Sequence, residues 1–296
     1  MTDDQRSALL QSARNIALAV QSGNVATVRA STIPSVAAQF DSIANSIQKL
    51  QPLISSAAIT IDALYALDAS DLKPGQEQTQ FFCDSPNSTL HEEMTIPQLP
   101  PGSYGLALVH ATGVPQPQQF ALLLEKNANW QLAGFFFRPL LVAGHDSLWY
   151  WTRARAFAQK GEKWNAHFYY EIAGYLATPI DFLNTPNLEK LVGEQAAVKL
   201  EGLPGEQPLR ITSNGKTYSI TNMHADASLG GLDLVVRYTA TDTSDPVATR
   251  AQILDLMKAL LTQYPELKDG FHGLWVFAEA PSQRPFGIEL PVSEIH

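Results

Sequence analysis

The chain has 296 residues, 45% of them hydrophobic, which is enough for two cores of ordinary size. Its formal net charge of -9 excludes nucleic acid and anionic membranes as main partners, because both require clustered Lys and Arg, and no such cluster is present. The longest apolar runs, such as residues 139–144, are far below the roughly 18–20 residues that cross a bilayer, so no membrane span is expected.

Two amphipathic helices are predicted in the first 55 residues. The first buries a stripe that ends before Gly23-Asn24 and comprises Leu9, Ala13, Ile16, Ala17 and Val20. The second runs from Pro34 to Pro52 and buries Val36, Phe40, Ile43, Ile47 and Leu50.

A sheet is predicted next, because the apolar period changes to two. The first strand places on one face Ile59, Ile61, Ala63, Tyr65 and Leu67. Further strands are predicted at residues 78–83, 89–96, 104–111, 119–126 and 130–141, with turn clusters such as Ser85-Pro86-Asn87 between them. The short Asn127-Ala128-Asn129 connection predicts an antiparallel hairpin. Helices followed by an antiparallel sheet indicate an α+β fold.

Residues 1–143 resemble an NTF2-like (cystatin-like cone) domain. The resemblance lies in the leading helices, the long sheet and a last strand that opens with W-x-L-A-G-F at residues 130–135. It implies a curved antiparallel sheet wrapped around a helix, with a concave cavity suited to a small ligand. It also implies that a homodimer through the open face of the sheet is common for the fold.

Residues 144–195 are predicted to form a helical hairpin that connects two domains. Asp146 or Ser147 would cap the first helix, whose face carries Tyr150, Ala154, Phe157 and Ala158. The second helix ends before Pro179 and carries Ala166, Tyr169, Tyr170, Ala173 and Leu176. The alternation of large and small residues resembles one tetratricopeptide repeat, but a single copy predicts a connector and not a solenoid.

Residues 196–296 are predicted to be a small βββαββ domain of the α+β class, which resembles no family. The Gly- and Pro-rich residues 201–208 mark its boundary, and Asn214-Gly215 marks a hairpin. Strands are expected at residues 209–212, 216–222, 232–239, 273–279 and 286–290. The helix after Asp245-Pro246 buries Ile253, Leu256, Met257, Leu260, Leu261 and Tyr264.

No catalytic motif, metal site or cofactor site is predicted from local spacing. The seven His residues show no HxH, HxxxH or HExxH pairing, and the single Cys83 excludes a CxxC site. There is no GxSxG elbow, and Gly230-Gly231 lacks the features of a phosphate loop. No export signal follows Met1, so the chain as given is expected to be cytoplasmic, or periplasmic or secreted if a signal was removed. Abundant Gln and scarce Lys favour a bacterial protein.

The cone mouth supplies the candidate ligand-binding residues. Period-two alternation places Tyr104 and His110 on one face of the strand at residues 104–111. It also places Trp130, Phe136 and Arg138 on one face of the last strand, at residues 130–141. In a catalytic interpretation, His110 would be a general base and Tyr104 would polarise a carbonyl oxygen. In the simpler interpretation, Arg138 pairs with an acid and the aromatic rings fill the cone.

The sequence therefore favours a non-catalytic ligand-binding, protein-binding or scaffold protein. Its partner would be a small apolar ligand in the cone or a protein docked on the hairpin. The alternative is a cone-pocket isomerase, dehydratase or hydrolase for a small hydrophobic substrate, which would require His110 or Arg138 to face an open cavity.

Overall fold

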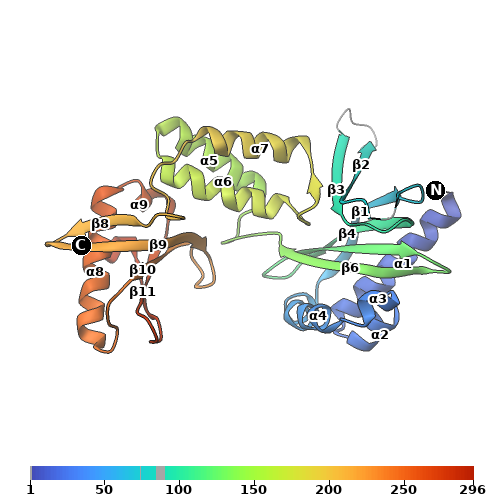
Figure 1. Ribbon diagram of the computed structural model, residues 1–296, viewed down its shortest axis with the longest axis horizontal. Helices are drawn as coiled ribbons and strands as arrows, with labels where there is room; N and C mark the ends of the chain where they lie inside the picture. Colours follow the sequence, from blue (N-terminus) through green and yellow to red (C-terminus); the bar gives the residue numbers. More distant parts are fainter. Residues whose placement is uncertain (1, 74, 85–90) are drawn as a thin grey trace. The chain divides into compact units, whose positions relative to one another are not determined.

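A computed structural model describes residues 2–73, 75–84 and 91–296, and shows an α+β protein (Figure 1). Two compact units make up the chain. The N-terminal unit comprises Met1–Leu141 and Tyr175–Lys190, and the C-terminal unit comprises Val142–Gly174 and Leu191–His296. Among the described residues, no helix combines the length and the apolar character that crossing a membrane requires.

Four helices open the N-terminal unit: α1 (Asp3–Gln21), α2 (Val25–Ala30), α3 (Pro34–Ala37) and α4 (Asp41–Ile54). A capping box fixes the start of α1, because Gln5 N donates to Thr2 Oγ1 and Thr2 N donates to Gln5 Oε1. The single helix predicted from Pro34 to Pro52 was wrong: the chain breaks at residues 38–40 and α4 continues past Pro52. A proline in the last turn removes only one hydrogen bond, so the helix still reaches Ile54.

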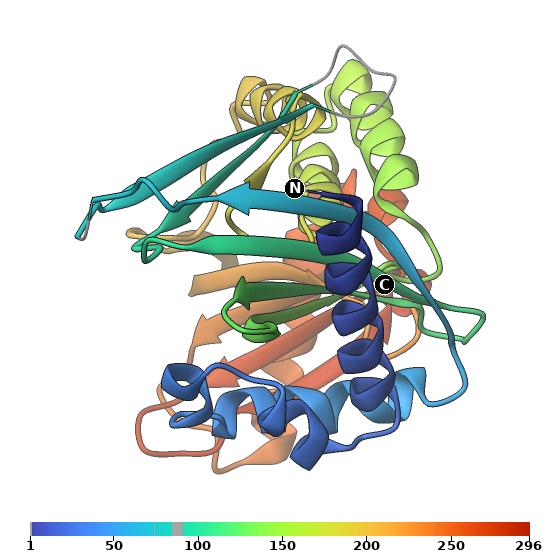
Figure 2. The same ribbon diagram turned by 90° about the vertical axis from the view of Figure 1, so that its right-hand side faces the viewer.

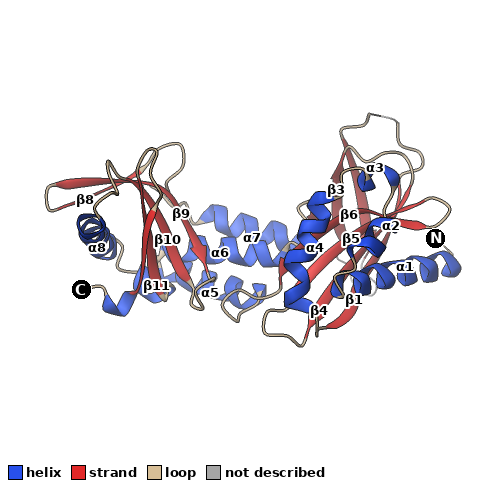
Figure 3. Cartoon of the chain, turned by 90° about the horizontal axis from the view of Figure 1, so that it is seen from below, coloured by secondary structure: helices blue, strands red, loops and turns tan. Residues whose placement is uncertain are grey.

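The main sheet of the N-terminal unit is antiparallel throughout, in the order β1-β4-β5-β6. Its strands are β1 (Ala58–Asp68), β4 (Ser103–Thr112), β5 (Gln118–Lys126) and β6 (Trp130–Pro139). The predicted hairpin between the last two strands is confirmed. The helices lie on one face of this sheet (Figures 2 and 3). Helix α1 approaches so closely that a Cβ on Gly105 would lie 2.5 Å from Leu9 Cδ1, which explains a glycine there.

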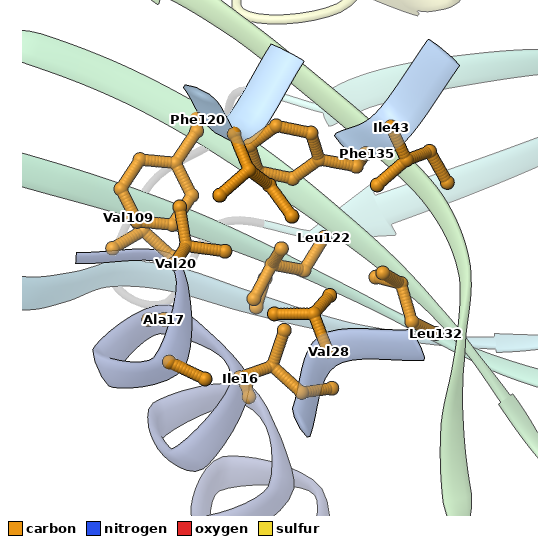
Figure 4. Packing of buried hydrophobic residues seen from close by; sticks show 14 of the residues in the cluster. Ile16, Ala17, Val20, Val28, Ile43, Val109, Phe120, Leu122, Leu132 and Phe135 are labelled. Atoms are coloured by element: carbon orange, nitrogen blue, oxygen red, sulfur yellow. The ribbon is translucent and has the colours of Figure 1, made fainter. Parts of the chain in front are cut away.

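The helix-facing side of the main sheet forms a continuous apolar core. Ile16, Val20, Val28, Ile43, Val109, Phe120, Leu122, Leu132 and Phe135 are among its buried residues (Figure 4). At about 25 cal/mol per Å² of apolar surface, burial on this scale is the main force that holds the helices to the sheet. The inside of the predicted cone is therefore filled with side chains.

A second, three-stranded sheet covers the opposite face. It consists of β2 (Gln78–Asp84), β3 (His91–Pro97) and the short β7 (Leu183–Asn184), and it is antiparallel. Met94 and Ile96 pack with Leu67, Leu106 and Leu183 in a second core. Residues 85–90, where one predicted turn lies, are outside the described residues.

A bulge at Asp62 changes which side chains of β1 share a face. Ile61 pairs with Val109 and Ala63 with Leu108, so Asp62 is the extra residue. Ile59, Ile61 and Leu64 pack toward the helices, whereas Tyr65 and Leu67 pack toward the second core. The predicted single face from Ile59 to Leu67 was therefore wrong, because one extra residue moves every later side chain to the other side.

The C-terminal unit begins with α5 (Ser147–Lys160) and most of α6 (Lys163–Ala177). Asp146 caps α5 by accepting from Trp149 N at 2.8 Å. The predicted buried face of α5 is confirmed at Tyr150, Ala154 and Phe157, but Ala158 is exposed. A third helix, α7 (Pro186–Ala197), runs through residue 195, where the sequence placed a boundary.

The sheet of the C-terminal unit has the order β12-β11-β10-β9-β8. Its strands are β8 (Leu209–Ser213), β9 (Lys216–Asp226), β10 (Asp233–Thr239), β11 (Gly273–Glu279) and β12 (Phe286–Pro291). The strands β10 and β11 are parallel, joined by α8 (Pro246–Gln263) and α9 (Leu267–Gly270), and η1 (Val292–Glu294) follows β12. The predicted order of strands and long helix is confirmed, and α8 lies beside the sheet in Figure 3.

Candidate functional site

The five predicted site residues lie on both faces of the main sheet. Leu124 pairs with Leu132 and Leu123 with Gly134, so Ala133 forms a bulge in β6. Trp130 consequently packs in the helix-side core, whereas Phe136 pairs with Ala121 of the second core. The prediction that Trp130 shares a face with Phe136 and Arg138 was wrong for this reason.

His110 and Arg138 have acidic partners. His110 Nδ1 lies 3.6 Å from Asp62 Oδ1, in the bulge of β1. Arg138 pairs with Asp181, donates to Tyr175 O at 3.3 Å and lies over the Tyr175 ring. Phe136 is 39% exposed and meets the edge of Phe182. The acidic partner of Arg138 is what the simpler interpretation expected, whereas the exposed ring of Phe136 does not fill the cone.

Tyr104 and Trp130 meet at a cavity of about 320 Å³ at one end of the main sheet. Its walls come from the start of α1, the end of β1 and the adjoining ends of β4, β5 and β6. They are lined by Gln5, Ala66, Leu67, Asp68, Ser103, Tyr104, Lys126 and Trp130. We call this cavity the Trp130 pocket. The sequence identified two of its residues, but missed Gln5 and Lys126, whose proximity depends on the packing of α1 and the hairpin.

Trp130, which lines this pocket, has one buried donor without an acceptor among the described residues. Its side chain is 7% exposed, and Nε1 has no hydrogen-bond partner among the described residues. A buried polar atom without a partner is uncommon and destabilises the fold by about 1–3 kcal/mol. The ammonium of Lys126 lies 5.6 Å from the centre of the Trp130 ring, so a positive charge is close by.

Tyr104 is a neutral wall of the same pocket. Its hydroxyl donates to Pro100 O at 3.0 Å. Burial, and secondarily the Glu125 carboxylate, raise the pKa of Tyr104. At the rim, hydrogen bonds from Ser70 lower the pKa of Asp68. After a movement of the Trp130 side chain that uncovers Nε1, the pocket can present an indole N–H and the Lys126 ammonium to an acceptor on a ligand.

The helices of the C-terminal unit hold a second polar cluster, centred on Glu194. Its carboxylate accepts from Trp151 Nε1 at 2.8 Å, from Arg155 Nε and Nη2 at 2.7 and 2.8 Å, and from Tyr170 OH at 3.3 Å. The Arg155 bonds above all, and then those of Trp151 and Tyr170, lower the pKa of Glu194 to about 2. Because the carboxylate is saturated with donors, it joins α7 to α5 and α6.

An open cavity of about 430 Å³ adjoins this cluster, lined in part by Lys163, Tyr170, Glu194 and Lys199. The sequence gave no reason to select Glu194, because α7 was predicted only as a short helical tail. The one available signal was the spacing of Trp151 and Arg155, which places both on one helical face.

One group of side chains could hold a metal ion among the residues that the structure describes. Ligand atoms of Asp233, His272 and Glu289 all lie within 4.8 Å of one another. A search for local His spacing could not detect this group, because its members come from three separate segments. Asp233 and His272 are 39 positions apart.

Comparison with protein-family models, with curated proteins and with solved structures found no match to this chain.

Proposed function

We propose that this chain is a non-catalytic binding protein whose N-terminal unit takes a small ligand in the Trp130 pocket. The observation that carries the proposal is that Trp130 lines a cavity of about 320 Å³ and that its buried Nε1 has no acceptor among the described residues. The ligand combines an apolar body with a hydrogen-bond acceptor, and Lys126 favours an anionic acceptor such as a carboxylate.

Binding would repair an existing defect of the unliganded fold. An acceptor that reaches Nε1 restores the hydrogen bond that the indole lost on leaving water. This exchange contributes about 1–3 kcal/mol to the affinity. The aromatic ring of Trp130 supplies apolar contact beside the donor, so one residue serves both parts of the ligand.

An NTF2-like assignment of residues 1–143 remains part of this proposal. It is supported by helices packed on one face of an antiparallel sheet and by a ligand-sized cavity at the end of that sheet. The second sheet distinguishes this chain from the expected pattern, because it covers the face through which a homodimer was predicted. A homodimer, if formed, requires a different surface.

The geometry favours binding over catalysis in the cone. The catalytic alternative needed His110 or Arg138 at an open cavity, and neither lines the Trp130 pocket. Tyr104, which does line it, has a raised pKa and stays protonated at neutral pH. A protein partner on the helical hairpin stays a prediction from the sequence.

Indole NMR tests the proposal at the atom that carries it. The Nε1–H resonance of Trp130 is assigned from its disappearance in Trp130→Phe, and octanoate and 4-phenylbutyrate are titrated into the full chain. We expect a shift of this resonance with both carboxylates, a weaker response to the corresponding alcohols, and about tenfold weaker binding in Trp130→Phe.

Trp275→Phe is the matched control, because Trp275 lies on β11 in the C-terminal unit. It should leave carboxylate binding unchanged. Equal affinity of wild type and Trp130→Phe for every probe, or no binding at all, would contradict the proposed site.

A further inference from the structure

Three acidic or imidazole side chains converge at one end of the C-terminal sheet. Asp233 is the first residue of β10, His272 directly precedes β11, and Glu289 belongs to β12. The main chain of His272 is held on both sides, because its N–H donates to Leu232 O at 2.7 Å and its carbonyl accepts from Val292 N at 2.9 Å. The position of the His272 main chain is thus set by the residue before β10 and the residue after β12.

The group places two carboxylates beside one imidazole, and only one of the carboxylates is in contact with that imidazole. Asp233 is only 1% exposed, and its Oδ1 lies 3.2 Å from His272 Nδ1. Glu289 Oε1 is buried without any hydrogen-bond partner among the described residues. Two carboxylates this close need a cation or a shared proton.

Glycine keeps open the space between the two carboxylates. A Cβ on Gly273 would lie 2.6 Å from Glu289 Oε1 and 2.8 Å from Asp233 Oδ1, so both oxygens converge on one point above the glycine. A Cβ on Gly231 would lie 2.5 Å from His272 Cγ, so a second glycine leaves room for the imidazole. Any larger residue at 231 or 273 would displace a member of the group.

We propose that Asp233, His272 and Glu289 bind a divalent transition-metal ion, Zn²⁺ or Mn²⁺. One imidazole and two carboxylates are a ligand set that such ions accept, whereas Mg²⁺ and Ca²⁺ favour oxygen ligands alone. The 3.2 Å between His272 Nδ1 and Asp233 Oδ1 matches the edge of a tetrahedron with metal–ligand distances near 2.0 Å, which is about 3.3 Å. The ligand atom of Glu289 lies within 4.8 Å of the other two and approaches the ion by a side-chain movement.

The site is open to solvent on the imidazole side, where the His272 side chain is 57% exposed. An ion can enter there and keep water in its remaining coordination positions. The competing arrangement is a proton shared between Asp233 and Glu289, without any metal. This inference concerns a different unit from the Trp130 pocket and does not depend on it.

Calorimetry on the full, untagged and chelator-treated chain tests the site with ZnCl₂ and MnCl₂. We expect one ion per chain, and at least about 100-fold weaker binding in His272→Ala and in Glu289→Gln, since the loss of even an outer partner lowers metal affinity about 10–100-fold. His224→Ala should bind like the wild type, because His224 lies on β9 of the same sheet and contacts Asn222.

Electron paramagnetic resonance of bound Mn²⁺ shows direct ligation. Nitrogen coupling from the imidazole should be present in the wild type and absent in His272→Ala. The His272 side chain is largely exposed, so this variant keeps its thermal unfolding transition even if Asp233→Asn does not fold. Wild-type binding no tighter than that of both His272→Ala and Glu289→Gln overturns the metal site and favours the shared proton.

Discussion

Each unit contains more than one buried polar atom without a partner among the described residues, and the one at the candidate site differs in character between the units. In the N-terminal unit it is a donor, Trp130 Nε1, with a lysine ammonium nearby. In the C-terminal unit it is an acceptor, Glu289 Oε1, with a second carboxylate beside it. A missing acceptor favours an anionic or carbonyl ligand, and a missing donor favours a cation. Whether the unpartnered atom is a donor or an acceptor therefore predicts the chemistry of the ligand.

The contrast between Glu289 and Glu194 shows that burial alone does not make a carboxylate a ligand site. Glu194 receives hydrogen bonds from three side chains, and its pKa is lowered. Glu289 Oε1 receives no hydrogen bond from the described residues, and burial raises the pKa of Glu289. The hydrogen-bond donors around Glu194 give its carboxylate a structural role. The carboxylate of Glu289 lacks such donors and is therefore free to bind a ligand.

The largest expected effect tests whether ligand binding in each unit depends on the hydrophobic core of that unit alone. Phe120→Ala removes a fully buried ring from the helix-side core and should lower the free energy of unfolding of the N-terminal unit by about 3–5 kcal/mol. In this variant, binding of carboxylate ligands in the Trp130 pocket should weaken, while Zn²⁺ binding at Glu289 persists. Chemical denaturation and calorimetry measure the two effects.

Phe136→Ala is the matched control for this substitution. The ring of Phe136 is partly exposed on the other face, so the loss should stay below about 1.5 kcal/mol. Equal losses for the two variants would contradict the change of face at the Ala133 bulge. Loss of Zn²⁺ binding as well in Phe120→Ala would show that the Trp130 pocket and the metal site are not independent.

A smaller effect is expected at Glu194, where pH acts as the probe. Its folded-state pKa of about 2 lies below the ordinary value of 4.5, so the stabilisation is complete above pH 4.5 and is lost as the pH falls toward 2. The side chain is 26% exposed, and solvent screening reduces the contribution to about 2 kcal/mol. Glu194→Gln should remove this amount at pH 7 and little at pH 2.5, as measured by urea denaturation.

The control for Glu194 is Glu171→Gln on α6, which removes a half-exposed carboxylate 3.5 Å from His167. It should change the free energy of unfolding by less than about 0.5 kcal/mol. A difference between wild type and Glu194→Gln that stays constant from pH 7 to 2.5 would be incompatible with the charge-assisted bonds to Arg155.

The elements of the fold were largely predictable because they depend on local patterns. Spacing located α1 and the C-terminal strands, and Asp245-Pro246 marked the start of α8. The faces were not predictable, since the bulges at Asp62 and Ala133 carry no glycine or proline at the extra residue. One unrecognised residue is enough to reverse a face.

The candidate sites were less accessible to sequence reasoning than the elements. Trp130 was predicted as a ligand-binding residue, and that role stays a prediction, but the predicted face was wrong and most of its predicted partners lie elsewhere. The group around Glu289 depends on the pairing of β10, β11 and β12, which only the folded sheet determines. Non-local register is the information that a single sequence lacks.

The smallest expected effect is also the sharpest test of the comparison. Trp130→Phe removes an unpartnered donor and Glu289→Gln removes a buried charge, so Trp130→Phe should destabilise the ligand-free and metal-free chain by less than about 1 kcal/mol, and Glu289→Gln should stabilise it. Tyr218→Phe is the control, because its hydroxyl bonds to Asp255 Oδ2 at 2.7 Å and its loss should cost about 1.5–3 kcal/mol. Thermal unfolding in the presence of chelator ranks the three variants. If Trp130→Phe or Glu289→Gln destabilises the chain as much as Tyr218→Phe, the atom concerned already has a partner in the free protein. That result would contradict the proposed ligand site in the same unit.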